Sequence, residues 1–205
     1  MNDILAWKNR GLSPFLLAAV LLSPTMTAHA FGTTQCAASR FGSDLNCTAN
    51  DVSITGMAVV GDTTSCVGGT NVTLDLQMTV NFGSANRYDI GIFISNDGKS
   101  PQYIAPTGAA TCSVSALPAA SPFQNLNANA CGDGGGALSG IHYMPNVMVP
   151  CQSLAGAGGS LYIPFVVSWN HQSSGTCNSS LDVVPAGVAK CNAPTIAQGS
   201  VSVVV

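Results

Sequence analysis

Eight cysteines, all downstream of a segment that resembles an export signal, constrain this chain more than any other feature. Residues 1-30 contain two basic residues, then an apolar run from Phe15 to Leu22, then Ala28-His29-Ala30, the small-x-small pattern that signal peptidases recognise. We expect cleavage after Ala30. The apolar run is shorter than the about 20 residues of a membrane-spanning helix, and no later segment reaches that length, so we expect no membrane span after cleavage.

The cysteines predict four structural disulfides. An even number of cysteines in an exported chain is typical of a disulfide framework. A structural zinc site would show close Cys-x2-4-Cys pairs, and no such pair occurs here. Spacing alone leaves about 105 pairings open. The disulfide residues are Cys36, Cys47, Cys66, Cys112, Cys131, Cys151, Cys177 and Cys191.

Composition favours strands and excludes nucleic acid as a partner. Every acidic residue is Asp and none is Glu, while Val, Thr, Ser, Asn and Gly are abundant, which is typical of strands and turns. The chain after residue 30 has four basic and eight acidic residues, a formal charge of -4. Four scattered cations cannot supply the electrostatic attraction that nucleic-acid binding requires.

Alternating apolar residues predict a strand from Asn71 to Phe82 and a second from Tyr88 to Ile94. The intervening Gly-Ser-Ala-Asn at 83-86 is turn chemistry, so 71-95 reads as a hairpin. Residues 161-169 alternate as well, and Pro164 within them indicates an edge strand or a bulge. Weaker strand candidates are 51-60, 102-106, 110-115, 145-150, 181-184 and the chain end at 200-205.

The strands and turns predict an all-β fold, an antiparallel β-sandwich of the immunoglobulin-like kind, with a barrel as the alternative. Residues 116-140 and 152-160 are rich in Gly and read as long surface loops. About 175 residues remain after signal cleavage, which suits one domain. We therefore expect a single disulfide-stapled β domain over residues 31-205.

Three motifs carry a resemblance to a known kind of domain. They are the octapeptide CTANDVSI at Cys47–Ile54, NRYDIGIFI at Asn86–Ile94 with Asp97-Gly98 following, and VSWN at Val167–Asn170 ahead of Cys177 and Lys190-Cys-Asn192. Together they resemble an uncharacterised cysteine-rich exported domain of bacterial surface proteins, often near immunoglobulin-like repeats. The resemblance implies an envelope or extracellular β domain and no activity. Such domains often end in Cys-x-Cys, whereas Asn-Ala follows Cys191 here, and this departure leaves the terminal pairing open.

Catalytic residues are sparse, and we predict a protein that is not an enzyme. A triad of Ser173 or Ser179 with His171 and Asp182 is conceivable, but no Gly-x-Ser-x-Gly nucleophile turn occurs. A histidine in a solvated loop is the simpler interpretation of His171, and a half-buried strand residue that of His142. Without any Glu, a glycosidase acid/base pair is also poorly supported.

Metal ligands are equally sparse, and we expect no cofactor. Asn96, Asp97 and Asp133 are weak candidates for Ca²⁺, because Asp-Gly sequences are ordinary turns. Arg87 and Asp89 share one parity and are expected on the polar face of their strand. Binding of a partner is one interpretation of this pair, and a surface ion pair with a cross-strand neighbour such as Asp75 is the simpler one. Trp169 is expected in the core.

The function that these residues favour is that of an exported structural or adhesive protein of the cell surface. Its partner would be a protein, including copies of itself in an extracellular filament, through strand pairing by residues 200-205 or Phe31–Gln35. Completion of the chain's own sandwich by 200-205 is the simpler interpretation of that segment. A secreted carbohydrate- or calcium-dependent binding module is the second hypothesis, and a small secreted hydrolase using His171 is the third.

Overall fold

The computed structural model describes residues 32–61, 66–152, 161–173, 177–179, 182–183 and 189–193. Predictions for residues 1-30, for most of 152-160 and for 200-205 therefore lie outside the described residues. Within the described ranges the elements are β1 (Gly32–Thr34), α1 (Ala37–Phe41), β2 (Val52–Val60), β3 (Asn71–Phe82), β4 (Tyr88–Ser95), β5 (Cys112–Ala116), β6 (Ser139–Pro150), β7 (Phe165–Asn170) and β8 (Ala189–Asn192).

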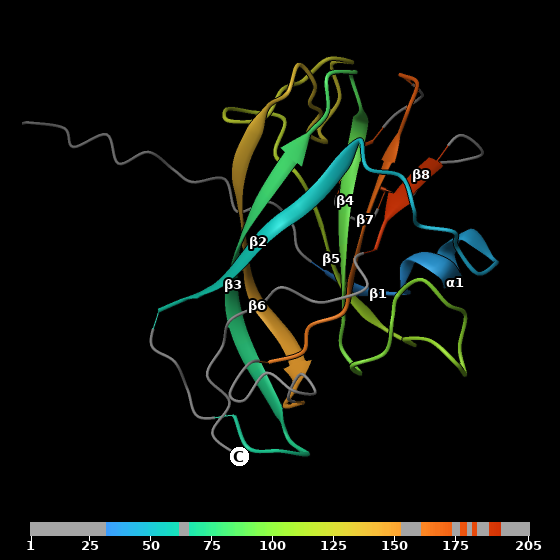
Figure 1. Cartoon of the computed structure of the whole chain (residues 1–205), viewed down its shortest axis with the longest axis vertical. Coiled ribbons are helices and arrows are strands. Elements are labelled where there is room, and N and C mark those ends of the chain that lie inside the picture. The colour runs from blue at the N-terminus through green and yellow to red at the C-terminus, as the bar shows by residue number, and fades with distance from the viewer. Residues whose placement is uncertain are drawn as a thin grey trace, which may run out of the picture.

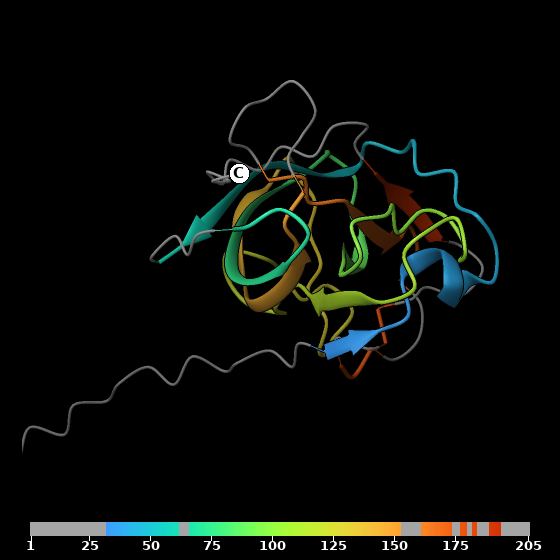
Figure 2. The same ribbon diagram turned by 90° about the horizontal axis from the view of Figure 1, so that it is seen from below.

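The strands form two antiparallel sheets that pack face to face, which confirms the all-β sandwich prediction (Figures 1 and 2). One sheet has five strands in the order β1-β5-β4-β7-β8, and the other has three in the order β2-β3-β6. Every strand pair within these sheets is antiparallel. The immunoglobulin-like connectivity stays a prediction.

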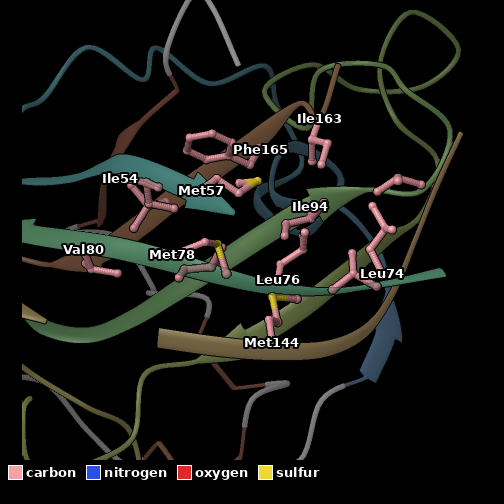
Figure 3. Close-up of a cluster of buried hydrophobic side chains, with 14 of the residues drawn as sticks. Ile54, Met57, Leu74, Leu76, Met78, Val80, Ile94, Met144, Ile163 and Phe165 are labelled. Atoms are coloured by element: carbon pink, nitrogen blue, oxygen red, sulfur yellow. The ribbon is translucent and has the colours of Figure 1, made fainter. Parts of the chain in front are cut away.

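The main core lies between the two sheets and follows from the alternation in β3. Leu76, Met78 and Val80 on β3 are fully buried, and they pack against Ile92, Ile94, Val167 and Trp169 from the five-stranded sheet. Figure 3 shows Leu76, Met78 and Met144 beside Ile94 in this layer. The prediction that Trp169 is a core residue is confirmed.

A second, smaller core covers the other face of the five-stranded sheet. Phe93 and Val166 point away from the main core and pack against Ala37 of α1 and against six cysteines. Those cysteines are Cys36, Cys47, Cys112, Cys131, Cys177 and Cys191. Because of this second layer, β4, β5 and β7 are buried almost throughout, whereas β3 and β6 have one wet face.

The predicted hairpin over 71-95 is wrong, although both of its strands exist. β3 pairs with β2 and β6, while β4 pairs with β5 and β7 in the opposite sheet. The link at 83–87 crosses between the sheets: Gly83 donates to Asp51 O, and Arg87 exchanges two backbone hydrogen bonds with Gly134. Both strands bury one side against the same core, so their alternation cannot distinguish a hairpin from a crossover.

The remaining strand predictions are confirmed in part. β2 and β5 match 51-60 and 110-115 closely, and 145-150 is the second half of β6. Residues 102-106 form turns, and the described part of 181-184 is not a strand. Pro164 lies just before β7, which is an inner strand between β4 and β8, so the edge-strand prediction is wrong. β8 and α1 were not predicted. β1 lies within Phe31–Gln35, which was expected to pair with a neighbouring chain, but it pairs with β5 of its own chain.

No helix in the described ranges is long and apolar enough to cross a membrane.

Candidate functional site

All eight cysteines pair, as predicted. The bonds are Cys36–Cys112, Cys47–Cys191, Cys66–Cys151 and Cys131–Cys177. Cys66–Cys151 belongs to the main core, and the other three lie in the second core over the five-stranded sheet. Four disulfides indicate that the protein folds in an oxidising compartment, extracellular or periplasmic.

The second core ends at a cluster of buried polar side chains built on a bulge in β4. The β4–β7 register shifts between Tyr88 and Gly91, and Asp89 within this bulge has a positive φ of 53°. Asp tolerates this left-handed conformation better than most residues. Asp89 is 4% exposed, so the prediction that it lies on a polar surface is wrong. Arg87 pairs with Asp51 (3.1 Å) and not with Asp75.

Asp89 faces a second buried carboxylate, Asp133, which is 0% exposed. Residues 131–134 run beside β4, where Ile90 donates to Gly132 O (3.1 Å) and Gly134 donates to Arg87 O (3.0 Å). The Asp89 backbone N–H donates to Asp133 Oδ1 (2.9 Å). The two carboxyl groups therefore lie at one junction between β4 and the long loop.

Neutral donors surround both carboxylates, and we call this set the Asp89–Asp133 cluster. Asp89 accepts hydrogen bonds from the side-chain amides of Asn127 (3.3 Å), Asn129 (2.8 Å) and Asn170 (3.0 Å). Asp133 Oδ2 accepts the backbone N–H of Leu126 (2.6 Å). The cluster thus joins β4, the end of β7 and the loop at 126–133.

The electrostatics of the cluster are those of buried negative charge. Burial raises the pKa of Asp133 above its ordinary value, and the neighbouring charge of Asp89 raises it further, while backbone N–H groups oppose the shift. Two amide oxygens of the cluster, Asn127 Oδ1 and Asn170 Oδ1, are buried and accept no hydrogen bond in the described structure. Unpaired buried acceptors are uncommon and indicate strain, a functional role, or a water molecule or ion at that position.

Sequence reasoning identified Asp133 but missed Asp89, Asn127, Asn129 and Asn170. A signal for part of the set was present, because Asn125, Asn127, Asn129 and Asp133 recur within nine residues. The contribution of Asn170 depends on the pairing of β4 with β7 and is not visible in the sequence.

The outer face of the three-stranded sheet is a second candidate surface. Ile141, Tyr143 and Met148 of the edge strand β6 are 48%, 49% and 41% exposed. Opposite them on β3 stand Thr79, Gln77 and Thr73. Asp75 on this face accepts hydrogen bonds from Tyr143 Oη (2.6 Å) and Asn146 N (2.8 Å). These hydrogen bonds lower the pKa of Asp75, and the bond from Tyr143 has the larger effect.

Comparison of the chain with protein-family models, with curated proteins and with solved structures finds no match. The site must therefore be interpreted from its own geometry.

The other predicted metal candidates form a turn. Asp97 Oδ1 accepts the Ser95 hydroxyl (2.9 Å) and the Lys99 N–H (3.1 Å), and Asp97 Oδ2 accepts the Ala110 N–H (3.1 Å). Asn96 Oδ1 accepts the Ser113 hydroxyl (2.8 Å). Among the described residues, Asn96 and Asp97 thus share no hydrogen-bond partner with Asp133, and their contacts close the loop after β4.

The candidate catalytic residues lie on different elements. His142 on β6 is 4% exposed, more deeply buried than predicted, and its Nε2 is 2.9 Å from the Ser115 hydroxyl of β5. His171 and Ser173 follow the end of β7. The Ser179 hydroxyl donates to Asp182 Oδ2 (3.1 Å), whereas in a triad a histidine stands between serine and aspartate.

The raised pKa of Asp133 predicts a pH dependence of stability. The folded protein holds this proton more tightly than the unfolded chain, so protonation favours folding. In metal-free buffer, the contribution of Asp133 to the free energy of unfolding should rise as pH falls from 7 through its raised pKa. This contribution should level off below the ordinary pKa of an Asp side chain, about 3.9. Guanidinium midpoints of wild type and Asp133→Asn between pH 7 and pH 4 measure this. A pH-independent difference between the two proteins would contradict it.

Proposed function

We propose that the protein is an exported, non-enzymatic structural or adhesive protein of the cell surface. The outer face of the three-stranded sheet is its contact surface, and a second copy of the chain is its partner. The observation that carries the proposal is the row of exposed apolar side chains, Ile141, Tyr143 and Met148, on one edge strand.

The composition of this face supports a protein contact. Tyr and Met are enriched in the cores of protein interfaces, and charged residues are depleted there. The β3 side chains beside the row are Thr73, Gln77 and Thr79, which are uncharged. The carboxylate of Asp75 on the same face already accepts two hydrogen bonds from β6. Two such faces therefore meet with little electrostatic repulsion.

The disulfides support a structural role, which requires a long-lived fold, rather than a catalytic one. Four bonds tie both cores, so the sandwich resists local opening and proteolysis. Residues 200-205 remain a candidate strand for pairing with the edge of β6 in a neighbour, an edge that no described strand covers, and such pairing would extend contact into a filament.

The test is the association state of the mature chain, residues 31-205, in its oxidised form. Sedimentation over a wide concentration range should show dimers or larger species. Ile141→Lys combined with Met148→Lys should weaken association at least about tenfold, because burying two new charges costs more than the 1.4 kcal/mol that a factor of ten represents. Val67→Lys, at a residue 58% exposed outside the sheet, is the matched control and should change nothing.

A strictly monomeric wild-type protein at high concentration would refute the proposal. Deleting residues 200-205 separates its two forms: loss of association on deletion alone would assign the contact to strand pairing and not to the sheet face.

A further inference from the structure

We propose that the Asp89–Asp133 cluster binds a calcium ion. The inference concerns the opposite side of the fold from the contact face and goes beyond the proposed function.

The first argument is uncompensated charge. Asp89 and Asp133 are both at least nine-tenths buried, and the backbone N–H of Asp89 donates to Asp133 Oδ1 (2.9 Å). The donors to both carboxylates are asparagine amides and backbone N–H groups, which carry no net charge. Neutral donors stabilise a buried carboxylate without removing its net charge, and two such charges close together favour the uptake of a proton or a cation.

The second argument is the set of oxygen atoms without donors. Asn170 is 4% exposed, and its Nδ2 lies 3.0 Å from Asp89 Oδ2, yet its Oδ1 accepts no hydrogen bond. Asn127 Oδ1 is also buried and accepts no hydrogen bond. A half-turn of each carboxamide exchanges its nitrogen and oxygen, which places a ligand oxygen beside Asp89. Cation binding would thus use the atoms that the described structure leaves unsatisfied.

The donor chemistry selects calcium among common metals. The cluster offers carboxylate and amide oxygens only, since every cysteine is in a disulfide. Calcium takes six to eight oxygen ligands in irregular geometry, and backbone carbonyls and water complete such shells. Magnesium requires near-octahedral geometry, and zinc and copper prefer nitrogen and sulfur. Within the described residues, no three side chains of His, Cys, Asp or Glu are placed so that they could hold a metal ion together, so the amide oxygens are essential to the site.

The location gives the ion a structural role. Asn127 and Asp133 lie on the loop, whereas Asp89 and Asn170 lie on β4 and β7. Asn125, Leu126 and Ala128 beside the cluster are exposed, so the loop part of the cluster lies close to the protein surface. A bound ion would tie the loop to the five-stranded sheet next to the Cys131–Cys177 disulfide.

The test uses the oxidised mature chain with calcium as the only added ligand. Extracellular calcium modules bind with Kd of about 10⁻⁴ to 10⁻³ M, so 10 mM calcium against EDTA should raise Tm by about 3–10 °C. A moderate guanidinium concentration keeps Tm measurable, and titration calorimetry should show one site. Magnesium at the same concentration should give a smaller shift.

Variants locate the ion. Asp89→Asn and Asp133→Asn should each abolish the calcium shift, and Asn127→Ala, which keeps both carboxylates, should weaken affinity at least threefold. Asp97→Asn is the matched control, since Asp97 accepts N–H bonds in a turn outside the cluster and should leave the shift intact.

If the wild type shows neither heat of calcium binding nor a calcium-dependent Tm shift, the proposal is overturned, and a proton rather than calcium compensates the buried carboxylate charge. An equal shift in wild type, Asp89→Asn and Asp133→Asn would overturn it as well, because calcium would then bind elsewhere. Neither result bears on self-association, which is measured separately.

Discussion

Reduction of the four disulfides should unfold the protein at 25 °C. Each bond contributes about 2–4 kcal/mol by restricting the unfolded chain, and the net stability of an ordinary domain is about 5–15 kcal/mol. The effect should be severe here because six of the eight cysteines form the centre of the second core. Without those bonds, the layer that covers Phe93 and Val166 consists mainly of loops and one five-residue helix.

Far-UV circular dichroism of oxidised and of reduced, alkylated protein measures this unfolding. Replacing one pair at a time distinguishes the two cores: Cys66→Ala with Cys151→Ala removes the bond in the main core, and Cys131→Ala with Cys177→Ala removes one in the second. A reduced chain that keeps the guanidinium midpoint of the oxidised protein would contradict the prediction.

Gly132→Ala should destabilise the oxidised protein by about 3 kcal/mol, the upper part of the range for overpacking. A methyl group at Gly132 would meet the backbone of Leu117 and Pro118, and the carbonyl oxygen of Pro118 would be its closest contact. Gly132 also donates to Leu117 O (2.6 Å) and accepts from Ile90 N, so neither neighbouring segment can move without breaking a hydrogen bond.

The matched control is Gly68→Ala, since nothing lies within 4 Å of a methyl group there and the φ of Gly68 is not positive. Its unfolding free energy should stay within about 0.5 kcal/mol of wild type. Guanidinium unfolding of both variants decides the matter, and equal midpoints for Gly132→Ala and wild type would show that Gly132 does not lie against the backbone of Leu117 and Pro118 as described.

The candidate site shows why sequence reasoning reached only part of it. Asp133 was identified within a Gly-rich loop, but a loop sequence does not reveal which strand the loop packs against. Asp89 was assigned to a surface because strict alternation placed it on the polar parity of its strand. The bulge between Tyr88 and Gly91 and the disulfide layer over that face reverse the assignment. Alternation describes one face of a strand relative to the other and cannot show that both are covered.

The sequence by itself determined the strands from Asn71 to Phe82 and from Tyr88 to Ile94, the all-β class and the fact that every cysteine forms a disulfide, because these follow from local alternation, turn residues, composition and the even number of cysteines. Only the tertiary structure decided which cysteines pair, that β3 and β4 lie in opposite sheets, and that Asp89 meets Asp133. Those three results depend on contacts between residues far apart in the chain, such as Asp89 and Asp133 at a separation of 44. Local preferences are equal for many such arrangements, and the packing of both cores selects one of them.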